Sequence, residues 1–167
     1  MATITTNHTT LTGAQVEPFL TENGVIFEQW DTTKLPAHLQ ENFALTDQQK
    51  GEVLAVFDEE IASISKRRNY ITADVISLSS TTPNLEELLV NFQKEHHHSD
   101  DEVRFIVSGH SVFVIQGVDG EFFSVHLSPG DLISVPPNVR HYFTLAEDKQ
   151  TVAIRLFASN DGWVAIY

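Results

Sequence analysis

The sequence contains no cysteine among its 167 residues, and its 10 lysines and arginines are outnumbered by 23 aspartates and glutamates. Without cysteine there is no disulfide, thiol nucleophile, zinc ribbon or iron–sulfur cluster, so any metal must be held by imidazole and carboxylate. The formal net charge of −13 argues against nucleic-acid binding, because phosphate-tracking surfaces need clustered basic residues. The one basic cluster is Lys66-Arg67-Arg68.

Long apolar runs are also missing, and none approaches the roughly 20 residues needed to cross a bilayer. Residues 1–10 are mostly threonine and asparagine without lysine or arginine, so they do not resemble a secretion signal. We therefore expect a soluble, cytoplasmic protein with neither a membrane nor a nucleic-acid partner. For a chain of this size and charge a monomer is the default expectation.

Helical spacing in the front half contrasts with short apolar runs in the back half. Thr46 and Gln49 form a capping-box pattern that predicts a helix over 47–66, weakened in its first turns by Gly51, and Asn84 with Glu87 begins a second helix that should end near Lys94. After Ser99, runs rich in Val, Ile and Phe predict strands over 102–108, 111–116, 121–127, 131–135, 142–145, 151–157 and 163–166, with Asp119-Gly120 as a hairpin turn. Strands at this spacing form a sandwich or a jelly-roll barrel. We predict one α+β domain over 1–167, with helices mainly in the N-terminal half and residues 1–8 as the part open to flexibility.

The segment Glu95–Arg104 concentrates three of the eight histidines beside four carboxylates. Side chains alternate in extended backbone, so His96 and His98 share a face, and Glu102 and Arg104 join them if the alternation survives the intervening turn. Two imidazoles and one carboxylate are a ligand set that suits Fe(II) and leaves positions open. His141, which follows the Pro136-Pro137 turn, is the best candidate for a fourth ligand, and His97 should face away. The spacing alone also fits a solvated polar connection or an adventitious metal site.

A larger frame raises the case for a metal. His96-x-His98-x3-Glu102-x6-Gly109, followed by Gly130-x5-Pro136-x4-His141, resembles the two motifs of the cupin superfamily, a jelly-roll barrel with its metal inside. Asn138 stands where a glycine is usual, a mild departure because asparagine tolerates the left-handed conformation. Leu145 stands where an asparagine is usual, which indicates a divergent branch.

That branch resembles the acireductone dioxygenase family. The similarity is carried by Lys94–Phe105, Gly130–Pro136, His141-Tyr142-Phe143, Ile154–Phe157 and Gly162-Trp163, and more weakly by Phe27–Trp30 and the helix after Thr46. It is strongest from about residue 84 onwards.

The resemblance implies an enzyme of methionine salvage. Its substrate would be 1,2-dihydroxy-3-oxo-5-(methylthio)pentene, cleaved with O2 to 4-methylthio-2-oxobutanoate and formate with iron, or to 3-(methylthio)propanoate, formate and carbon monoxide with nickel. By the same similarity one Fe(2+) or Ni(2+) per chain would be held by His96, His98, Glu102 and His141. Nothing in the sequence chooses between the two metals.

An acidic chain needs a cation inside its pocket to hold an anionic enediol. Arg104 lies on the predicted inward face and matches the family's substrate-binding arginine, so it is the predicted catalytic and substrate-binding residue. Arg155 is a second candidate, although an arginine on such a strand could instead face solvent or pair with an outer carboxylate. The aromatic residues predicted to wall the methylthio tail are Phe92, Phe105, Phe143 and Trp163, all of which could equally be core residues.

Two alternatives stay open from the sequence. The chain could be another cupin oxygenase acting on a different small molecule, which the Leu145 departure permits. It could also be a non-catalytic cupin that binds a ligand or a partner protein, if the histidines do not all point inward.

Overall fold

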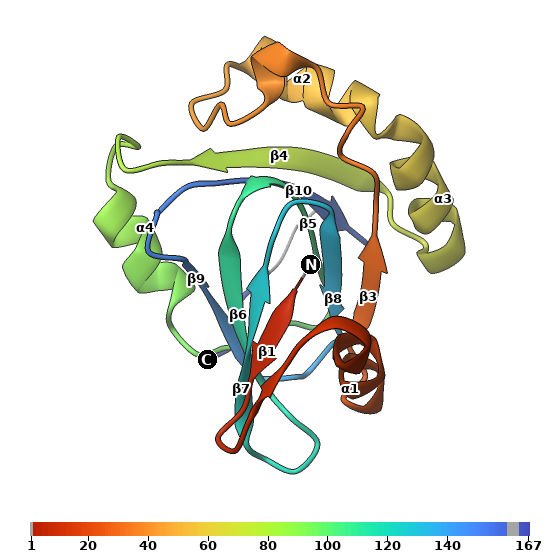
Figure 1. Ribbon diagram of the computed structural model, residues 1–167, viewed down its shortest axis with the longest axis vertical. Helices are drawn as coiled ribbons and strands as arrows, with labels where there is room; N and C mark the ends of the chain where they lie inside the picture. Colours follow the sequence, from red (N-terminus) through yellow and green to blue (C-terminus); the bar gives the residue numbers. More distant parts are fainter. Residues whose placement is uncertain (1, 160–163) are drawn as a thin grey trace.

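Two five-stranded antiparallel sheets form the body of the computed structural model, which describes residues 2–159 and 164–167 (Figure 1). The first sheet has the order β2-β1-β7-β6-β9 and the second the order β3-β8-β5-β10-β4. The strands are β1 (Thr3–Thr5), β2 (Thr10–Leu11), β3 (Ile26–Gln29), β4 (Thr72–Leu78), β5 (Glu102–Gly109), β6 (Ser111–Gln116), β7 (Phe122–Leu127), β8 (Asp131–Val135), β9 (His141–Leu145) and β10 (Thr151–Phe157). Neighbouring strands are often distant in sequence, as in a jelly-roll barrel. Two antiparallel sheets accompanied by helices confirm the predicted α+β fold class.

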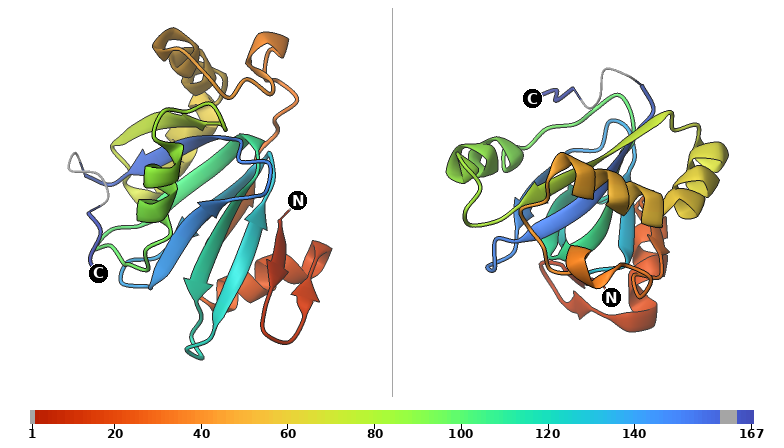
Figure 2. Two further views of the ribbon diagram at one scale, coloured as in Figure 1. Left: turned by 90° about the vertical axis from the view of Figure 1, so that its left-hand side faces the viewer. Right: turned by 90° about the horizontal axis from the view of Figure 1, so that it is seen from above.

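The helices lie around this barrel and come mainly from the N-terminal half of the chain. They are the 3-10 turns η1 (Gly13–Gln15) and η2 (Ala37–Leu39), and the α-helices α1 (Val16–Glu22), α2 (Asp47–Val56), α3 (Asp58–Arg68) and α4 (Leu85–Phe92). Helix α2 packs against β4, α1 against β3 and α4 against β9 (Figures 1 and 2). Seen from above in Figure 2, α2 and α3 cover the outer side of the second sheet.

Strand β5 separates two hydrophobic cores, because its side chains alternate between the faces of the sheet. Ile106 belongs to the core between the two sheets, together with residues such as Phe113 and Phe143. Val103 and Phe105 belong to the second core, which lies under α2 and α3. Glu102 and Arg104 therefore point into the barrel, as the alternation predicts.

The helix predicted over 47–66 is in fact two helices. Its start is as predicted, since the Thr46 hydroxyl accepts a hydrogen bond from the Gln49 amide and the Gln49 side chain accepts one from the Thr46 amide. The break falls at Phe57, where φ is −106° and ψ is 19°. Phe57 is fully buried, with its ring 5.0 Å from that of Phe105, so the break falls at a residue of the core under the helices.

The remaining differences lie at element ends. Helix α4 ends at Phe92 rather than near Lys94, and the Asn84 side chain makes no capping hydrogen bond. Over 164–166, the described part of the strand predicted at 163–166, the structure has only a bridge from Ile166 to His97, so that strand prediction is wrong there. Thr3–Thr5, in the segment expected to be flexible, form strand β1 and pair with β7.

Candidate metal centre

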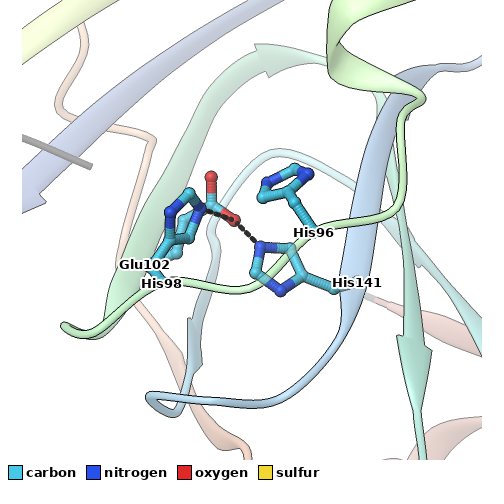
Figure 3. Close-up of side chains that lie close together, drawn as sticks. All are labelled: His96, His98, Glu102 and His141. Atoms are coloured by element: carbon cyan, nitrogen blue, oxygen red, sulfur yellow. Dashed lines mark ion pairs between the residues drawn. The ribbon is translucent and has the colours of Figure 1, made fainter. Parts of the chain in front are cut away.

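Four side chains from three segments converge inside the barrel (Figure 3). His96 and His98 lie in the connection between α4 and β5, Glu102 is the first residue of β5, and His141 is the first residue of β9. Each offers one donor atom, and these four atoms all lie within 4.8 Å of one another. All four residues are buried, with exposed fractions between 1% and 8%.

Backbone pairing brings the two histidine-bearing segments together. The amide of His96 donates to the carbonyl of His141 at 3.0 Å, and the amide of His141 donates to the carbonyl of His96 at 2.8 Å. Next to this bridge, Asn138 has φ +67° and its amide donates to the carbonyl of His98 at 2.8 Å. The asparagine at the usual glycine position thus adopts the left-handed conformation expected of it.

The three imidazole rings are oriented by main-chain carbonyls. A carbonyl oxygen can only accept, so each Nδ1 carries the proton and each Nε2 presents its lone pair, the form in which an imidazole binds a cation. The three Nδ1 bonds run from His96 to the Lys94 oxygen at 2.6 Å, from His98 to the Val164 oxygen at 2.9 Å, and from His141 to the Val139 oxygen at 2.8 Å. Burial lowers the pKa of His96, against the opposing effect of the Lys94 carbonyl, which favours the neutral form that binds metals.

Glu102 supplies the negative charge of the centre. Burial alone would raise its pKa, but in the metal-free protein His141, when its Nε2 is protonated, and Arg104 outweigh this and lower it to about 2. Its Oε2 lies 2.6 Å from His141 Nε2 and 3.9 Å from His98 Nε2. Glu102 Oε2 and His141 Nε2 find no hydrogen-bond partner within residues 2–159 and 164–167. Two buried acceptor atoms facing each other are costly unless a cation lies between them, so the residues fit a bound metal ion.

Arg104 lies beside the cluster on the same face of β5. Its Nη2 is 3.4 Å from Glu102 Oε1, and its guanidinium carbon is 4.2 Å from the centre of the Phe143 ring and 5.8 Å from that of Phe113. Arg104 is 3% exposed, and burial lowers its pKa. Arginine nevertheless stays protonated in proteins, so the interior of the barrel holds a fixed cation next to the four ligand candidates.

The aromatic candidates divide between the two sides of the sheet. Phe143 lies under Arg104, and Phe92 packs edge-on against it with ring centres 5.6 Å apart. Phe105 points the other way and packs against Trp30 and Phe57, so the structure does not bring this predicted wall residue to the metal cluster. Trp163 lies outside the described residues.

Arg155 on β10 stands directly opposite Arg104 on β5, but its side chain forms an ion pair with Asp74 on the edge strand β4. Its Nε and Nη2 donate to the two carboxylate oxygens of Asp74 at 2.7 and 2.6 Å. This is the carboxylate pairing that the sequence left open as an alternative to substrate binding.

Two aromatic residues near the centre were missed from the sequence. Phe113 lies 6.1 Å from the His141 ring and Tyr167 lies 6.2 Å from the His96 ring, measured between ring centres. Phe113 pairs with Phe143 across β6 and β9, a register that the sequence does not reveal. His97 is not among the four clustered residues, and its Nδ1 lies 3.5 Å from Nη1 of Arg140.

A jelly-roll barrel with three imidazoles and one carboxylate gathered in its interior defines a metal-binding protein of the cupin type. Comparison with known proteins narrows this to one family. The ARD/ARD' family matches residues 18–165, and the chain belongs to it.

Its relatives share both the sequence and the fold. Acireductone dioxygenases of Bacillus cereus and Bacillus anthracis are each 65% identical over 153 residues, which cover 92% of this chain and 90% of theirs. A solved acireductone dioxygenase from Bacillus anthracis, with a cadmium ion in its active centre, superposes with a TM-score of 0.97 at 60% identity, covering 100% of this chain and 98% of that one. The predicted family and its oxidoreductase class are confirmed. Among the described residues, no helix has both the length and the apolar character needed to span a bilayer.

Proposed function

We propose that this protein is a metal-dependent acireductone dioxygenase of methionine salvage that cleaves 1,2-dihydroxy-3-oxo-5-(methylthio)pentene with O2. The observation that carries the proposal is the convergence of four buried donor atoms beside a buried arginine, in a chain 65% identical to named acireductone dioxygenases. A non-catalytic cupin would have no need for this combination of ligands and cation.

The residues that would hold the metal are His96, His98, Glu102 and His141. A divalent iron or nickel ion bound by them would supply Lewis acidity and two open positions at which an enediolate could chelate. Three neutral imidazoles and one carboxylate leave such an ion with a net charge of about +1, which favours an anionic chelator.

Arg104 would bind the substrate anion. A protein of charge −13 repels an anion at long range, so attraction must come from groups inside the site. The guanidinium is held between the Glu102 carboxylate and the Phe143 ring, which fixes where its charge acts. Because these groups are buried, electrostatic attraction between them and a bound anion is stronger than it would be in solvent.

The methylthio tail would lie against the edge-to-face pair of Phe92 and Phe143. This pair continues from Arg104 towards α4, so a substrate anchored by its anionic end would meet an apolar surface at its other end. Phe113 extends the same apolar wall towards His141.

We propose that the same site can bind either iron or nickel, and that the bound metal determines the products. Iron would give the 2-oxo acid and formate, and nickel the shorter carboxylic acid, formate and carbon monoxide. Nickel binds nitrogen and oxygen ligands more tightly than iron at equal availability, so metal supply in the cell would select the form. We further propose a cytoplasmic monomer, which suits the small soluble substrate and the strongly acidic surface.

The test is reconstitution with one metal at a time. Metal-free protein is loaded anaerobically with iron or with nickel, and O2 uptake and products are measured with and without the enediol. We expect about one ion per chain and uptake only when the enediol is present. His98→Ala should lose both, whereas the neighbouring His97→Ala should keep both, because His97 is not part of the cluster.

Other outcomes distinguish the alternatives. Bound metal without enediol-dependent O2 uptake would refute the proposed substrate and favour another cupin oxygenase. A protein that binds neither iron nor nickel under anaerobic conditions would refute the enzyme and favour a ligand-binding cupin.

A further inference from the structure

Three side chains outside the metal cluster form a closed ring of hydrogen bonds. Arg68 donates from Nε to the Tyr70 hydroxyl at 3.0 Å and from Nη2 to Asp101 Oδ2 at 3.0 Å. The Tyr70 hydroxyl donates to the same Asp101 oxygen at 2.9 Å. Each member thus contacts the other two, which restricts all three more than a single ion pair would.

The ring lies on the side of the second sheet that faces α3. Tyr70 is 6% exposed and belongs to the core under the helices, whereas Glu102 points into the barrel. Helix α3 ends at Arg68, and the left-handed conformation of Asn69, with φ +63°, reverses the chain so that the Tyr70 side chain comes back beside Arg68. Since Asp101 precedes Glu102, the ring connects the end of α3 to the residue next to a ligand candidate.

Glu102 needs such an anchor because the sheet holds it on one side only. In β5 it pairs with Val135 of β8, but the pairing with β10 begins one residue later, at Val103. The residues just before it, 99–101, belong to no strand. A strand end of this kind can twist, and a twist at Glu102 would move its carboxylate away from the histidines.

We propose that Arg68, Tyr70 and Asp101 are positioning residues that fix the carboxylate of Glu102 for metal binding. The ring holds Asp101 on the outer face, and because Asp101 is joined directly to Glu102, this limits rotation of the strand end that directs Glu102 inward. This inference rests on the metal site of the proposed function, but it concerns residues that touch neither the metal nor the substrate.

Three conservative variants test the ring. Asp101→Asn removes the charge that Arg68 pairs with, Tyr70→Phe removes only a hydroxyl, and Arg68→Lys keeps the charge but cannot serve two acceptors from one planar fork. Groups that orient ligands from outside the coordination shell are commonly worth 10- to 100-fold in metal affinity. We expect about a tenfold loss for Asp101→Asn and Arg68→Lys, and about threefold for Tyr70→Phe.

Arg67→Ala is the matched control. Arg67 is the preceding residue of α3, and its guanidinium donates to both carboxylate oxygens of Glu28 at 3.0 and 3.2 Å. Glu28 lies on β3, which pairs with β8, so this ion pair does not anchor β5 directly. Removing this half-exposed pair perturbs the same end of α3 at a small cost in stability, and should leave the metal affinity within about twofold.

The measurement is competition of each full-length variant with a chelator for Co2+, read from the visible spectrum of the bound ion, alongside thermal unfolding of the metal-free protein. We expect the ring variants to bind more weakly and to show shifted Co2+ bands while still folded. Wild-type affinity and spectrum in all three ring variants, or losses no greater than in Arg67→Ala, would overturn the inference and leave the proposed function intact. Failure of the unmodified protein to bind Co2+ would instead contradict the proposed metal site, and the inference with it.

Discussion

The charge of Arg104 offers the most direct test of the proposed substrate binding. Arg104→Met keeps an unbranched side chain that can stay buried, but it is shorter and removes the guanidinium cation that lies over Phe143. Two unit charges about 4 Å apart attract by about 4 kcal/mol at an effective dielectric of about 20. Glu102, 3.4 Å from Nη2, already uses part of the guanidinium charge, so we take about 2 kcal/mol as the share available to the substrate.

A loss of about 2 kcal/mol corresponds to a roughly 30-fold higher KM for the enediol. The variant should keep about one metal ion per chain, because all four proposed ligands remain. Initial rates of O2 uptake against enediol concentration measure the KM, and metal analysis of the same sample measures occupancy. Arg104→Lys should lie between the wild type and Arg104→Met, since it keeps the charge but not the planar fork. An unchanged KM in the fully loaded Arg104→Met variant would refute the substrate-binding role.

Three further predictions concern pH and stability. Because the pKa of Glu102 falls from 4.5 to about 2 on folding, this residue should contribute about 3 kcal/mol to the free energy of unfolding above pH 4.5, and the contribution should be lost between pH 4.5 and 2. The lowered pKa of His96 should add a further loss of stability that begins as pH falls through about 6.5. Urea unfolding of metal-free protein across this pH range should show both losses, and a flat profile would refute them. Gly109→Ala should destabilise the protein by more than about 2 kcal/mol, since φ of Gly109 is +75° and a Cβ there would meet a backbone oxygen at 2.1 Å. Gly51→Ala in α2, which has open space around it, should instead stabilise by up to about 1 kcal/mol. Equal effects of the two variants in thermal unfolding would refute this distinction. Thr46→Ala should cost about 1 kcal/mol through loss of the α2 cap, and no change in the unfolding midpoint would show that the cap contributes nothing.

The barrel strands could be predicted because each is a short apolar run between turn residues. Strands β5, β6, β8 and β10 agree with the prediction to within one residue. The break at Phe57 could not be predicted, since the helical spacing continues through it and the ring of Phe57 packs against residues from distant segments, among them Trp30 and Phe105.

The ligand candidates were accessible to sequence reasoning because three of them lie within seven residues of extended or turning chain. The same alternation also separates Phe105 from Arg104, since adjacent residues on a strand face opposite sides, so the signal against Phe105 was present in the sequence. To predict that Phe113 lies next to Phe143, one would have to know the register of β6 with β9. To predict the ion pair of Arg155 with Asp74, one would have to know the register of β10 with β4. Such registers depend on contacts between distant segments.

The Nδ1 partners of the three histidines are peptide oxygens contributed by Lys94, Val139 and Val164. A peptide oxygen is retained whatever side chain its residue carries, so exchange of these three side chains should leave the imidazole orientations unchanged. Metal preference in this protein would then resist alteration by point substitution at those positions. An attempt to retune it would have to shift the course of the polypeptide itself, for instance by lengthening or shortening the loop that carries Val139.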